Sequence, residues 1–302
     1  MFRNLVLSGG AFKSAAFIGC IEYLEQEAMC ADIINVVGSS AGAVVALMFV
    51  AGFTSAEMKD YVLKESKRFL EAEIDFENVL DIFYTLGMDD GQKHVEAFGR
   101  ILEAKGMDPA SATFLSLAKQ SGRNLVVCGS NLTAARVEYF SVDTHPDMPV
   151  VDAVRISIAI PFLLTPVEYK GAIYVDASLF DNFATEYFCD PGRPLTDTLA
   201  LCITGGEDTA SGLADMNLLT YMHLLTVSMF YRLNKKNPSV ETSPTNKTVC
   251  INIQASNFDT ELFRLRAEKE EIEGFIEKGY EMICAAFKEP GAFKDQGGGE
   301  GI

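Results

Sequence analysis

Residues 36–42 read VVGSSAG, and this stretch decides how the first part of the chain folds. An apolar segment, 33–37, leads into it, and an apolar run, 41–53, follows it directly. A segment of strand length, a glycine-bounded turn and a run of helix length together predict a strand–turn–helix unit. Ser40 stands between Gly38 and Gly42 at the turn of that unit.

This arrangement matches the pattern G-x-S-x-G, in which a serine occupies a tight turn between a strand and a helix. The small neighbours let the strand and the helix approach each other, and the serine comes to lie at the helix N-terminus. There the partial positive charge and the free N–H groups favour an oxyanion. We therefore expect Ser40 to be a nucleophile, and a serine that only caps the helix is the alternative.

A second unit of the same kind lies just before the first. Residues 2–7 predict a strand, residues 8–14 (SGGAFKS) a turn, and residues 15–29 a helix with apolar residues at helical spacing. Two strand–turn–helix units in succession predict a parallel sheet with right-handed crossovers, which is an α/β fold.

The rest of the chain predicts further elements of the same fold. Predicted strands lie at 124–128, 138–142, 173–175, 198–203 and 248–253, and predicted helices fill most of 54–121 and cover 150–160, 213–233 and 263–287. The methionines and leucines of 213–233 suit either an acyl-chain groove or a core helix. The chain has 302 residues and no linker composition in its middle. We expect one domain over 1–287 and a disordered tail over 288–302.

Composition excludes several classes of partner and places the chain in a reducing compartment. A net charge of −17 repels phosphate backbones and anionic membrane surfaces, so we expect no nucleic acid and no basic membrane anchor.

The 7 cysteines show neither a CxxC pair nor metal-ligand spacing, which fits a reducing compartment. The apolar run 41–53 is shorter than the ~20 residues of a membrane span, and residues 1–7 are too short for a signal peptide. We expect a cytoplasmic protein without a metal or cofactor.

The glycine turn at 8–14 predicts an anion site, because its backbone N–H groups face outward between a strand and a helix. A nucleotide phosphate fits poorly: Phe12 replaces the glycine that should precede Lys13, and Leu7 stands where the first glycine of a phosphate loop should be. A dinucleotide fits poorly as well, since no acidic residue ends the second strand. An oxyanion hole beside Ser40 is the better use of the turn.

A nucleophilic Ser40 needs a base that accepts the proton of its hydroxyl. The histidines, His94, His145 and His223, do not follow strand ends as a Ser-Asp-His hydrolase requires. Asp176 does end a predicted strand, and carboxyl ends of strands are where α/β sites form. A free carboxylate has a pKa of about 4 and is a poor base, but an apolar pocket would raise that pKa. We expect Asp176 to be the base, and an aspartate that caps a turn is the alternative.

Four blocks in this order resemble the patatin-like phospholipase family. They are SGGAFKS at 8–14, GSSAG at 38–42, DAVRISIAIPF at 152–162 with its continuation through Pro166 and Gly171, and YVDAS at 174–178 followed by Asn182. The resemblance covers about residues 4–185. It implies a three-layer α/β fold with a mostly parallel central sheet and a nucleophile elbow.

The resemblance also implies a mechanism and a class of substrate. Ser40 would attack a lipid ester, Asp176 would act as base and then as acid, and the N–H groups of Gly9, Gly10 and Ala11 would hold the oxyanion. Lys13 keeps the basic residue of the family's loop. The family acts on phospholipids, lysophospholipids or neutral lipids without calcium, so the expected partner is a lipid, with transient membrane contact through an apolar surface. The oligomeric state stays open.

Some positions depart from the family's pattern. Ala11 and Ser14 replace glycines of the first block. The two small residues that follow the aspartate are mostly glycines in the family, and here they are Ala177 and Ser178. The N–H of Ala11 can serve the oxyanion if that residue avoids a positive φ. The departures keep open a lipid-binding or interaction protein without turnover. An acyltransferase on the same fold also stays open, as does a nucleotide-binding module that uses the glycine turn.

Overall fold

A computed structural model describes residues 2–71, 82–188, 197–204, 221–222, 225, 228, 246–252 and 268–288. The predicted helix at 213–233 lies outside the described residues except for single positions. The predicted tail does so as well, apart from Lys288, which ends the last helix.

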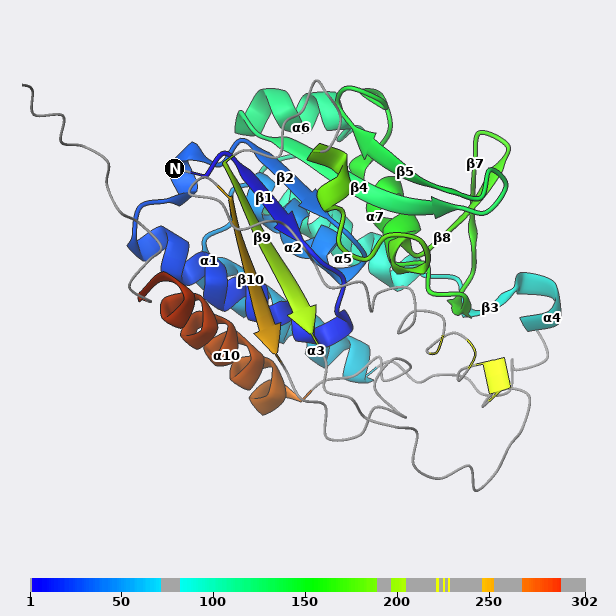
Figure 1. Cartoon of the computed structure of the whole chain (residues 1–302). Helices are drawn as coiled ribbons and strands as arrows, with labels where there is room; N and C mark the ends of the chain where they lie inside the picture. The colour runs from blue at the N-terminus through cyan, green and yellow to red at the C-terminus, as the bar shows by residue number, and fades with distance from the viewer. Residues whose placement is uncertain are drawn as a thin grey trace, which may run out of the picture.

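Within the described residues, a central sheet of eight strands has the order β10-β9-β1-β2-β4-β8-β7, and β5 pairs with β4 (Figure 1). Its strands are β1 (Asn4–Leu7), β2 (Asn35–Gly38), β4 (Asn124–Asn131), β5 (Arg136–Ser141), β7 (Val167–Tyr169), β8 (Ala172–Val175), β9 (Thr198–Thr204) and β10 (Asn246–Asn252). The five strands from β10 to β4 run parallel. The α/β class with a mostly parallel sheet is therefore confirmed.

The helices and short elements follow the two glycine turns and the later crossovers. The helices are α1 (Ala16–Gln26), α2 (Ala41–Val50), α3 (Ser55–Glu71), α4 (Ile82–Thr85), α5 (Gln92–Glu103), α6 (Phe114–Ser121), α7 (Val150–Ser157) and α10 (Lys269–Lys288). The 3₁₀ turns are η1 (Ala11–Ala15), η2 (Cys30–Asp32), η4 (Ala177–Leu179) and η5 (Thr185–Phe188), and β3 (Gly87–Asp89) pairs with β6 (Phe162–Leu164). Both predicted strand–turn–helix units are confirmed.

Alternate side chains of the parallel strands enter two different cores. On one face, Leu5, Val36 and Leu199 pack with helices that include α1, α2 and α10. On the other face, Val6, Val37, Val126 and Ala200 pack against the segment 177–188. This alternation follows from the pleat of a strand, which sends successive side chains to opposite sides. The two sides of the sheet are therefore specified by the same short apolar strands.

The antiparallel part of the sheet was not anticipated in detail. The predicted hairpin of β4 and β5 is present, but β8 also runs antiparallel to β4, with Val175 opposite Ser130. The strands β3, β6 and β7 have three residues each and were not predicted, because such short segments carry no periodic pattern. Helix α7 ends at Ser157, earlier than predicted, since a residue before proline avoids helical geometry and Pro161 follows closely.

No helix in the described ranges combines the length and the apolar content needed to cross a bilayer. The single domain over 1–287 stays a prediction, although β9, β10 and α10 pack in the same sheet and core as β1 and α1.

Helices α1 and α10 lie side by side in Figure 1, and glycines let their backbones touch. A Cβ atom on Gly19 would lie 1.9 Å from the carbonyl oxygen of Ile276, and one on Gly279 would lie 1.8 Å from that of Ala16. The Cys20 thiol also lies 3.4 Å from the Gly279 carbonyl oxygen. A side chain at either glycine would push the two helices apart.

We predict that Gly279→Ala lowers the free energy of unfolding by about 3 kcal/mol or more, because the clash is with backbone and overpacking of this kind is costly. The matched control is Gly274→Ala in the same helix, where an added Cβ meets nothing within 4 Å. That change should raise stability by up to ~1 kcal/mol through helix propensity. Urea denaturation measures both, and equal effects of the two substitutions would contradict the close helix contact.

Candidate active site

Ser40 lies at the junction of β2 and α2 in a strained backbone conformation, with φ 50° and ψ −129°. Such a conformation costs on the order of 1–3 kcal/mol for a residue with a side chain. Gly42 makes the turn possible, because a Cβ there would lie 2.3 Å from the Ser8 carbonyl oxygen. Gly38 faces the backbone of Ala43 at similarly short range. The two glycines of the motif therefore allow α2 to pack directly on the ends of β1 and β2.

The Ser40 hydroxyl donates a hydrogen bond of 2.7 Å to Asp176 Oδ2. Asp176 is completely buried, and its other oxygen, Oδ1, accepts a bond of 2.8 Å from the Ser178 N–H. The Asp176 N–H in turn donates to the Ala159 carbonyl oxygen. Two side chains from distant parts of the chain therefore meet in the geometry that proton transfer between them requires.

Burial sets the proton affinity of this carboxylate. Removal from water raises the pKa of Asp176 to about 6, although the hydrogen bonds from Ser40 and Ser178 act in the opposite direction. A carboxylate with that pKa is still ionised at neutral pH, yet it is a stronger base than an exposed aspartate. Asp176 can therefore act as the proton acceptor for the Ser40 hydroxyl.

Asp176 follows directly after β8, as expected from the sequence. The direction of that strand was not predicted: β8 is antiparallel to β4. Only Tyr174 and Val175 of β8 pair with β4, and they do so at its last residues, Ser130 and Asn131. Asp176 therefore reaches the carboxyl ends of the parallel strands from the opposite direction.

The glycine turn lies against Ser40, since a Cβ on Gly9 would be 3.1 Å from the Ser40 Cβ. The N–H of Gly9 donates to the Asn182 carbonyl oxygen at 3.0 Å, so it is already engaged. Within the described part of the chain, the N–H groups of Gly10 and Ala11 have no acceptor. Only these two of the three expected donors are therefore available to an oxyanion.

Ala11 has a positive φ of 47°, contrary to the condition under which its N–H was expected to serve an oxyanion, yet among the described residues that N–H has no acceptor and stays available. This left-handed conformation costs an alanine roughly 1–2 kcal/mol that a glycine would not incur. The residue keeps its N–H at the start of η1, where an intrahelical acceptor is not expected. Lys13 follows in the same turn, and its backbone N–H donates to the Gly10 carbonyl oxygen.

The loop 176–183 connects the separate pieces of the site. Ser178 Oγ donates to Asn182 Oδ1 at 2.6 Å, and the carbonyl of Asn182 holds the Gly9 N–H. Ser39 Oγ donates to the Asp181 carbonyl oxygen at 3.1 Å. One short loop thus contacts the glycine turn, the elbow and the carboxylate.

Ser157 was not predicted from the sequence as a site residue, and it lies behind the elbow. Its hydroxyl accepts a hydrogen bond of 2.9 Å from the Ser40 N–H, and its side chain is fully buried. Ser157 and Asn182 both lie in the blocks that carry the family resemblance, and that was the one signal that could have singled them out. The Ser40 N–H is consequently not an oxyanion donor here.

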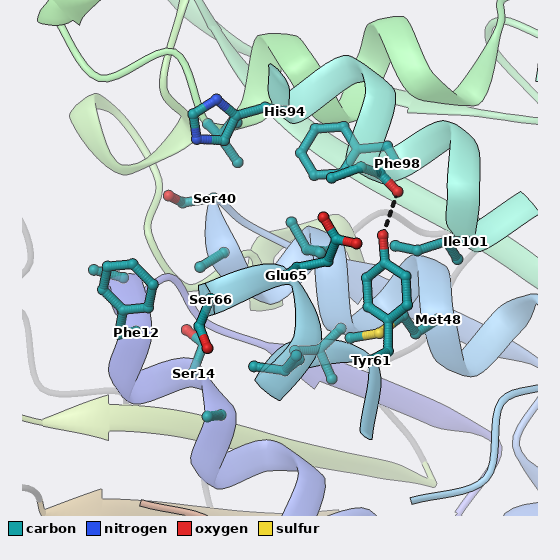
Figure 2. Close-up of a pocket in the computed structure, with 18 of the residues that line it drawn as sticks. Phe12, Ser14, Ser40, Met48, Tyr61, Glu65, Ser66, His94, Phe98 and Ile101 are labelled. Carbon is teal, nitrogen blue, oxygen red and sulfur yellow. Dashed lines mark hydrogen bonds between the residues drawn. The ribbon is translucent and has the colours of Figure 1, made fainter. Parts of the chain in front are cut away.

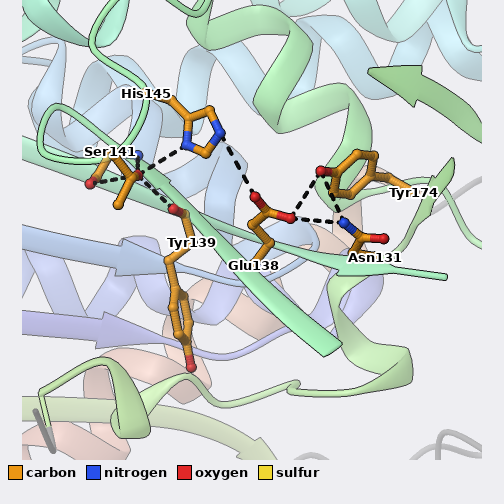
Figure 3. Close-up of polar contacts among 7 residues, drawn as sticks. Asn131, Glu138, Tyr139, Ser141, His145 and Tyr174 are labelled. Atoms are coloured by element: carbon orange, nitrogen blue, oxygen red, sulfur yellow. Dashed lines mark hydrogen bonds and ion pairs between the residues drawn. The ribbon is translucent and has the colours of Figure 1, made fainter. Parts of the chain in front are cut away.

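A partly buried polar cluster fixes β8 against the hairpin of β4 and β5 (Figure 3). The Glu138 carboxylate accepts bonds of 2.9 Å from Asn131 Nδ2 and from the Tyr174 hydroxyl, and His145 Nε2 lies 3.8 Å from its other oxygen. Burial and the carboxylate raise the pKa of Tyr174 to about 12, so that hydroxyl stays a donor. Because Tyr174 precedes Asp176 by two residues, the cluster positions the strand end that carries the buried carboxylate.

The histidines fall into different places. His145 belongs to the cluster just described, and His223 lies outside the described residues. His94 lines the same pocket as Ser40, where burial lowers its pKa to about 4, so the imidazole is neutral at pH 7. The Ser40 hydroxyl has its bond to Asp176 instead, as the sequence analysis expected.

Ser40 lines an apolar cavity of about 220 Å³ (Figure 2). Figure 2 shows side chains from η1, α2, α3 and α5 around it. Apolar members include Phe12, Met48, Phe98 and Ile101, and polar members include Ser14 and Glu65. The cavity has the lining that an extended hydrocarbon group requires.

Among the described residues, no group of three or more histidine, cysteine, aspartate or glutamate side chains is arranged to hold a metal ion. The groups that this geometry brings together are the Ser40 hydroxyl, the Asp176 carboxylate and backbone N–H groups of the glycine turn.

A model of the patatin-like phospholipase family matches residues 5–188. Because the match covers more than half of the chain, the protein belongs to the patatin-like phospholipase family. Ser40, Asp176 and the glycine turn all lie within the matched residues.

Individual relatives are more distant. The chain is 26% identical over 185 residues to a probable lipid hydrolase, 463L, of invertebrate iridescent virus 6, a match that spans 60% of this chain and 61% of that protein. It is 30% identical over 199 residues to the uncharacterized protein YqhO of Bacillus subtilis strain 168, spanning 61% of this chain and 65% of that one. The chain thus matches less than two thirds of the length of either relative.

The crystal structure of VipD from Legionella pneumophila superposes with a TM-score of 0.55 at 18% identity. The superposition covers 94% of this chain and 66% of VipD. At that identity the likeness concerns the fold alone, and it agrees with the α/β architecture seen here.

We predict that Asp176→Asn stabilises the protein at neutral pH and less so in acid. The folded-state pKa of about 6 exceeds the ordinary value of 3.8, so ionisation of Asp176 favours the unfolded state as pH rises between these values. The difference in free energy of unfolding between the variant and the wild type should grow by on the order of 2–3 kcal/mol from pH 4 to pH 7.5.

Urea titrations at several pH values measure that difference. Asp147→Asn, which removes an exposed carboxylate, is the control for the loss of one negative charge. A flat difference for Asp176→Asn would show that its carboxylate is not held at a raised pKa.

Proposed function

We propose that the protein is a lipid acyl hydrolase that cleaves ester bonds of phospholipids or lysophospholipids through a Ser40–Asp176 dyad. The observation that carries the proposal is the 2.7 Å hydrogen bond from the Ser40 hydroxyl to a buried carboxylate, with Ser40 in the lining of an apolar cavity. Family membership and the name of the viral relative, a probable lipid hydrolase, support the same class of reaction.

In the first half of the reaction, Asp176 takes the proton of Ser40 Oγ as that oxygen attacks the ester carbonyl carbon. The N–H groups of Gly10 and Ala11 stabilise the oxyanion of the tetrahedral intermediate. When the intermediate collapses, the carbon–oxygen bond to the alcohol breaks, and the alcohol leaves with the proton from Asp176. The acyl group stays on Ser40 as an ester.

In the second half, a water molecule replaces the alcohol beside Asp176. Asp176 takes a proton from the water as the water oxygen attacks the acyl carbon, and the same N–H groups hold the new oxyanion. The bond from the acyl carbon to Ser40 Oγ then breaks, and Ser40 recovers the proton. The free fatty acid leaves, and Asp176 returns to its ionised form.

The cavity suits an acyl group that is a hydrocarbon chain. Burial of each methylene contributes about 0.8 kcal/mol, so a chain lying along Met48, Phe98 and Ile101 gains affinity without any charged contact. Access from a membrane would also depend on apolar contact, since the net charge of −17 opposes anionic surfaces. Phe180, in the loop that follows Asp176, is 39% exposed and is a suitable side chain for such contact.

Two alternative functions use the same residues. If an alcohol or a second lipid displaces water from the acyl-enzyme, the same site becomes an acyltransferase. If the strained Ala11 fails to present its N–H, the protein binds lipid without turnover. A nucleotide-binding role is not favoured, because the N–H of Gly9 is already engaged by Asn182.

We predict that Ser40→Ala and Asp176→Asn each reduce ester hydrolysis by a factor of about 10³ or more, as expected when a nucleophile or its base is removed. The measurement is fatty-acid release from a panel of phospholipids, lysophospholipids and neutral lipids. Asp152→Asn is the control, because partial removal from water also raises the pKa of that carboxyl group, but the Ser40 hydroxyl bonds to Asp176 and not to Asp152. Full turnover in either dyad variant would remove that residue from the mechanism.

Labelling by a serine-directed fluorophosphonate distinguishes an active site from a binding protein. The wild type should be labelled on Ser40 and Asp176→Asn much more slowly, whereas a protein without turnover would leave Ser40 unmodified.

We also predict that kcat/KM rises with pH through an apparent pKa near 6. The base must be ionised to accept a proton, and burial raises the pKa of Asp176 to about 6, so activity is lost as pH falls below that value. A pH–rate profile with a soluble ester measures it, using Asp152→Asn as the control for unspecific acid effects. An acid limb near pH 4 would show that the raised pKa does not govern the reaction.

A further inference from the structure

The hydroxyl of Ser14 is a buried polar group that the mechanism above does not use. Its residue is 2% exposed, and in the part of the chain that the structure describes, its oxygen has no hydrogen-bond partner. Leaving a buried hydroxyl without a partner costs about 1–3 kcal/mol. Ser14 lines the same cavity as Ser40 (Figure 2), so a bound molecule could supply the missing partner.

The position of Ser14 says which part of a substrate it would meet. Ala11, Ser14 and Ile18 all line the cavity along one face of η1 and α1. Three residues of a 3₁₀ helix rise by about 6 Å, so Ser14 lies roughly that far along the helix from the Ala11 N–H. Ser14 Oγ is also 3.1 Å from where a Cβ on Gly10 would be. The hydroxyl is therefore beside the oxyanion donors and a few bonds beyond the reacting carbonyl.

The charges around the cavity favour a neutral partner. Glu65 lines the cavity, and Arg100 binds its carboxylate through two bonds of 3.1 Å and 2.6 Å, which neutralises the pair. The His94 imidazole is neutral because burial lowers its pKa to about 4. These residues present no surplus positive charge to Ser14. Burial of an ionised carboxylate on the acyl chain would therefore be unfavourable there.

We propose that Ser14 is a specificity-determining residue whose hydroxyl donates a hydrogen bond to a neutral oxygen, a hydroxyl or a keto group, carried by the acyl chain a few carbons from the ester. The inference rests on the proposed function and deepens it, since it names oxygenated acyl groups as the preferred substrates. A plain hydrocarbon chain fills the cavity but leaves the Ser14 hydroxyl unsatisfied. An oxygenated chain satisfies it without adding charge.

The test compares kcat/KM for four p-nitrophenyl esters: dodecanoate and its 3-hydroxy, 5-oxo and 7-oxo derivatives. In the wild type, at least one oxygenated ester should be preferred over dodecanoate by about 3- to 10-fold, the range expected for one net hydrogen bond. In Ser14→Ala that ratio should fall to about 1. A ratio, and not an absolute rate, is the readout, because a merely structural effect of the substitution changes all four esters together.

Ser66→Ala is the matched control. Ser66 lines the same cavity, but its hydroxyl already donates to the Leu63 carbonyl oxygen at 3.0 Å. The preference should therefore persist in Ser66→Ala. Equal use of all four esters by the wild type, or a preference that survives in Ser14→Ala, would overturn the inference while leaving the hydrolase intact.

A second measurement separates the inference from the hydrolase itself. Dodecanamide and its matching oxygenated amides are neutral and carry no ester, and their binding to Ser40→Ala can be followed by calorimetry. Tighter binding of an oxygenated amide, lost in the Ser14→Ala/Ser40→Ala double variant, would support the role of Ser14 even if the wild type hydrolysed none of the esters. A wild type that hydrolyses none of the esters would refute the proposed function. Equal binding of all the amides to Ser40→Ala would refute the role of Ser14.

Discussion

The hydrogen bond between the Ser40 hydroxyl and the Asp176 carboxylate is the contact on which the rest of the site depends. It joins the junction of β2 and α2 to the residue that follows β8, far along the chain, and it does so in a buried position. The loop after Asp176 makes the contact possible, because it holds the elbow through Asp181 and the glycine turn through Asn182. A shift of this loop would disturb the nucleophile, its base and the N–H donors at the same time.

The same features make the site costly for stability. Ser40 and Ala11 both adopt a positive φ, and burial of the ionised Asp176 is unfavourable. The surrounding structure compensates through the apolar strands and through helices such as α1 and α2, whose side chains are largely buried. The arrangement is typical of functional sites, where local strain persists because the scaffold is over-determined elsewhere.

Much of this architecture could be predicted from the sequence, because the glycine turns stand at clear changes of apolar pattern. VVGSSAG located β2, the elbow and α2, and the earlier turn located β1 and α1. The position of Asp176 also followed from the end of a strand, although the direction of β8 did not, since strand direction is set by pairing and leaves no local pattern. The roles of Ser157 and Asn182 are tertiary hydrogen bonds, and the φ of Ala11 is imposed by its turn, so neither could be read from composition or spacing.

The order of strands in the sheet has a consequence for how the chain is made. β1 lies between β2 and β9, and its pairing with β9 joins Asn4 to Thr198. During synthesis at ~5–20 residues per second, the free edge of β1 waits roughly 10–40 s for its second neighbour to leave the ribosome. Throughout that interval an apolar strand edge is open to wrong partners. The sheet is therefore completed only after most of the protein has been translated.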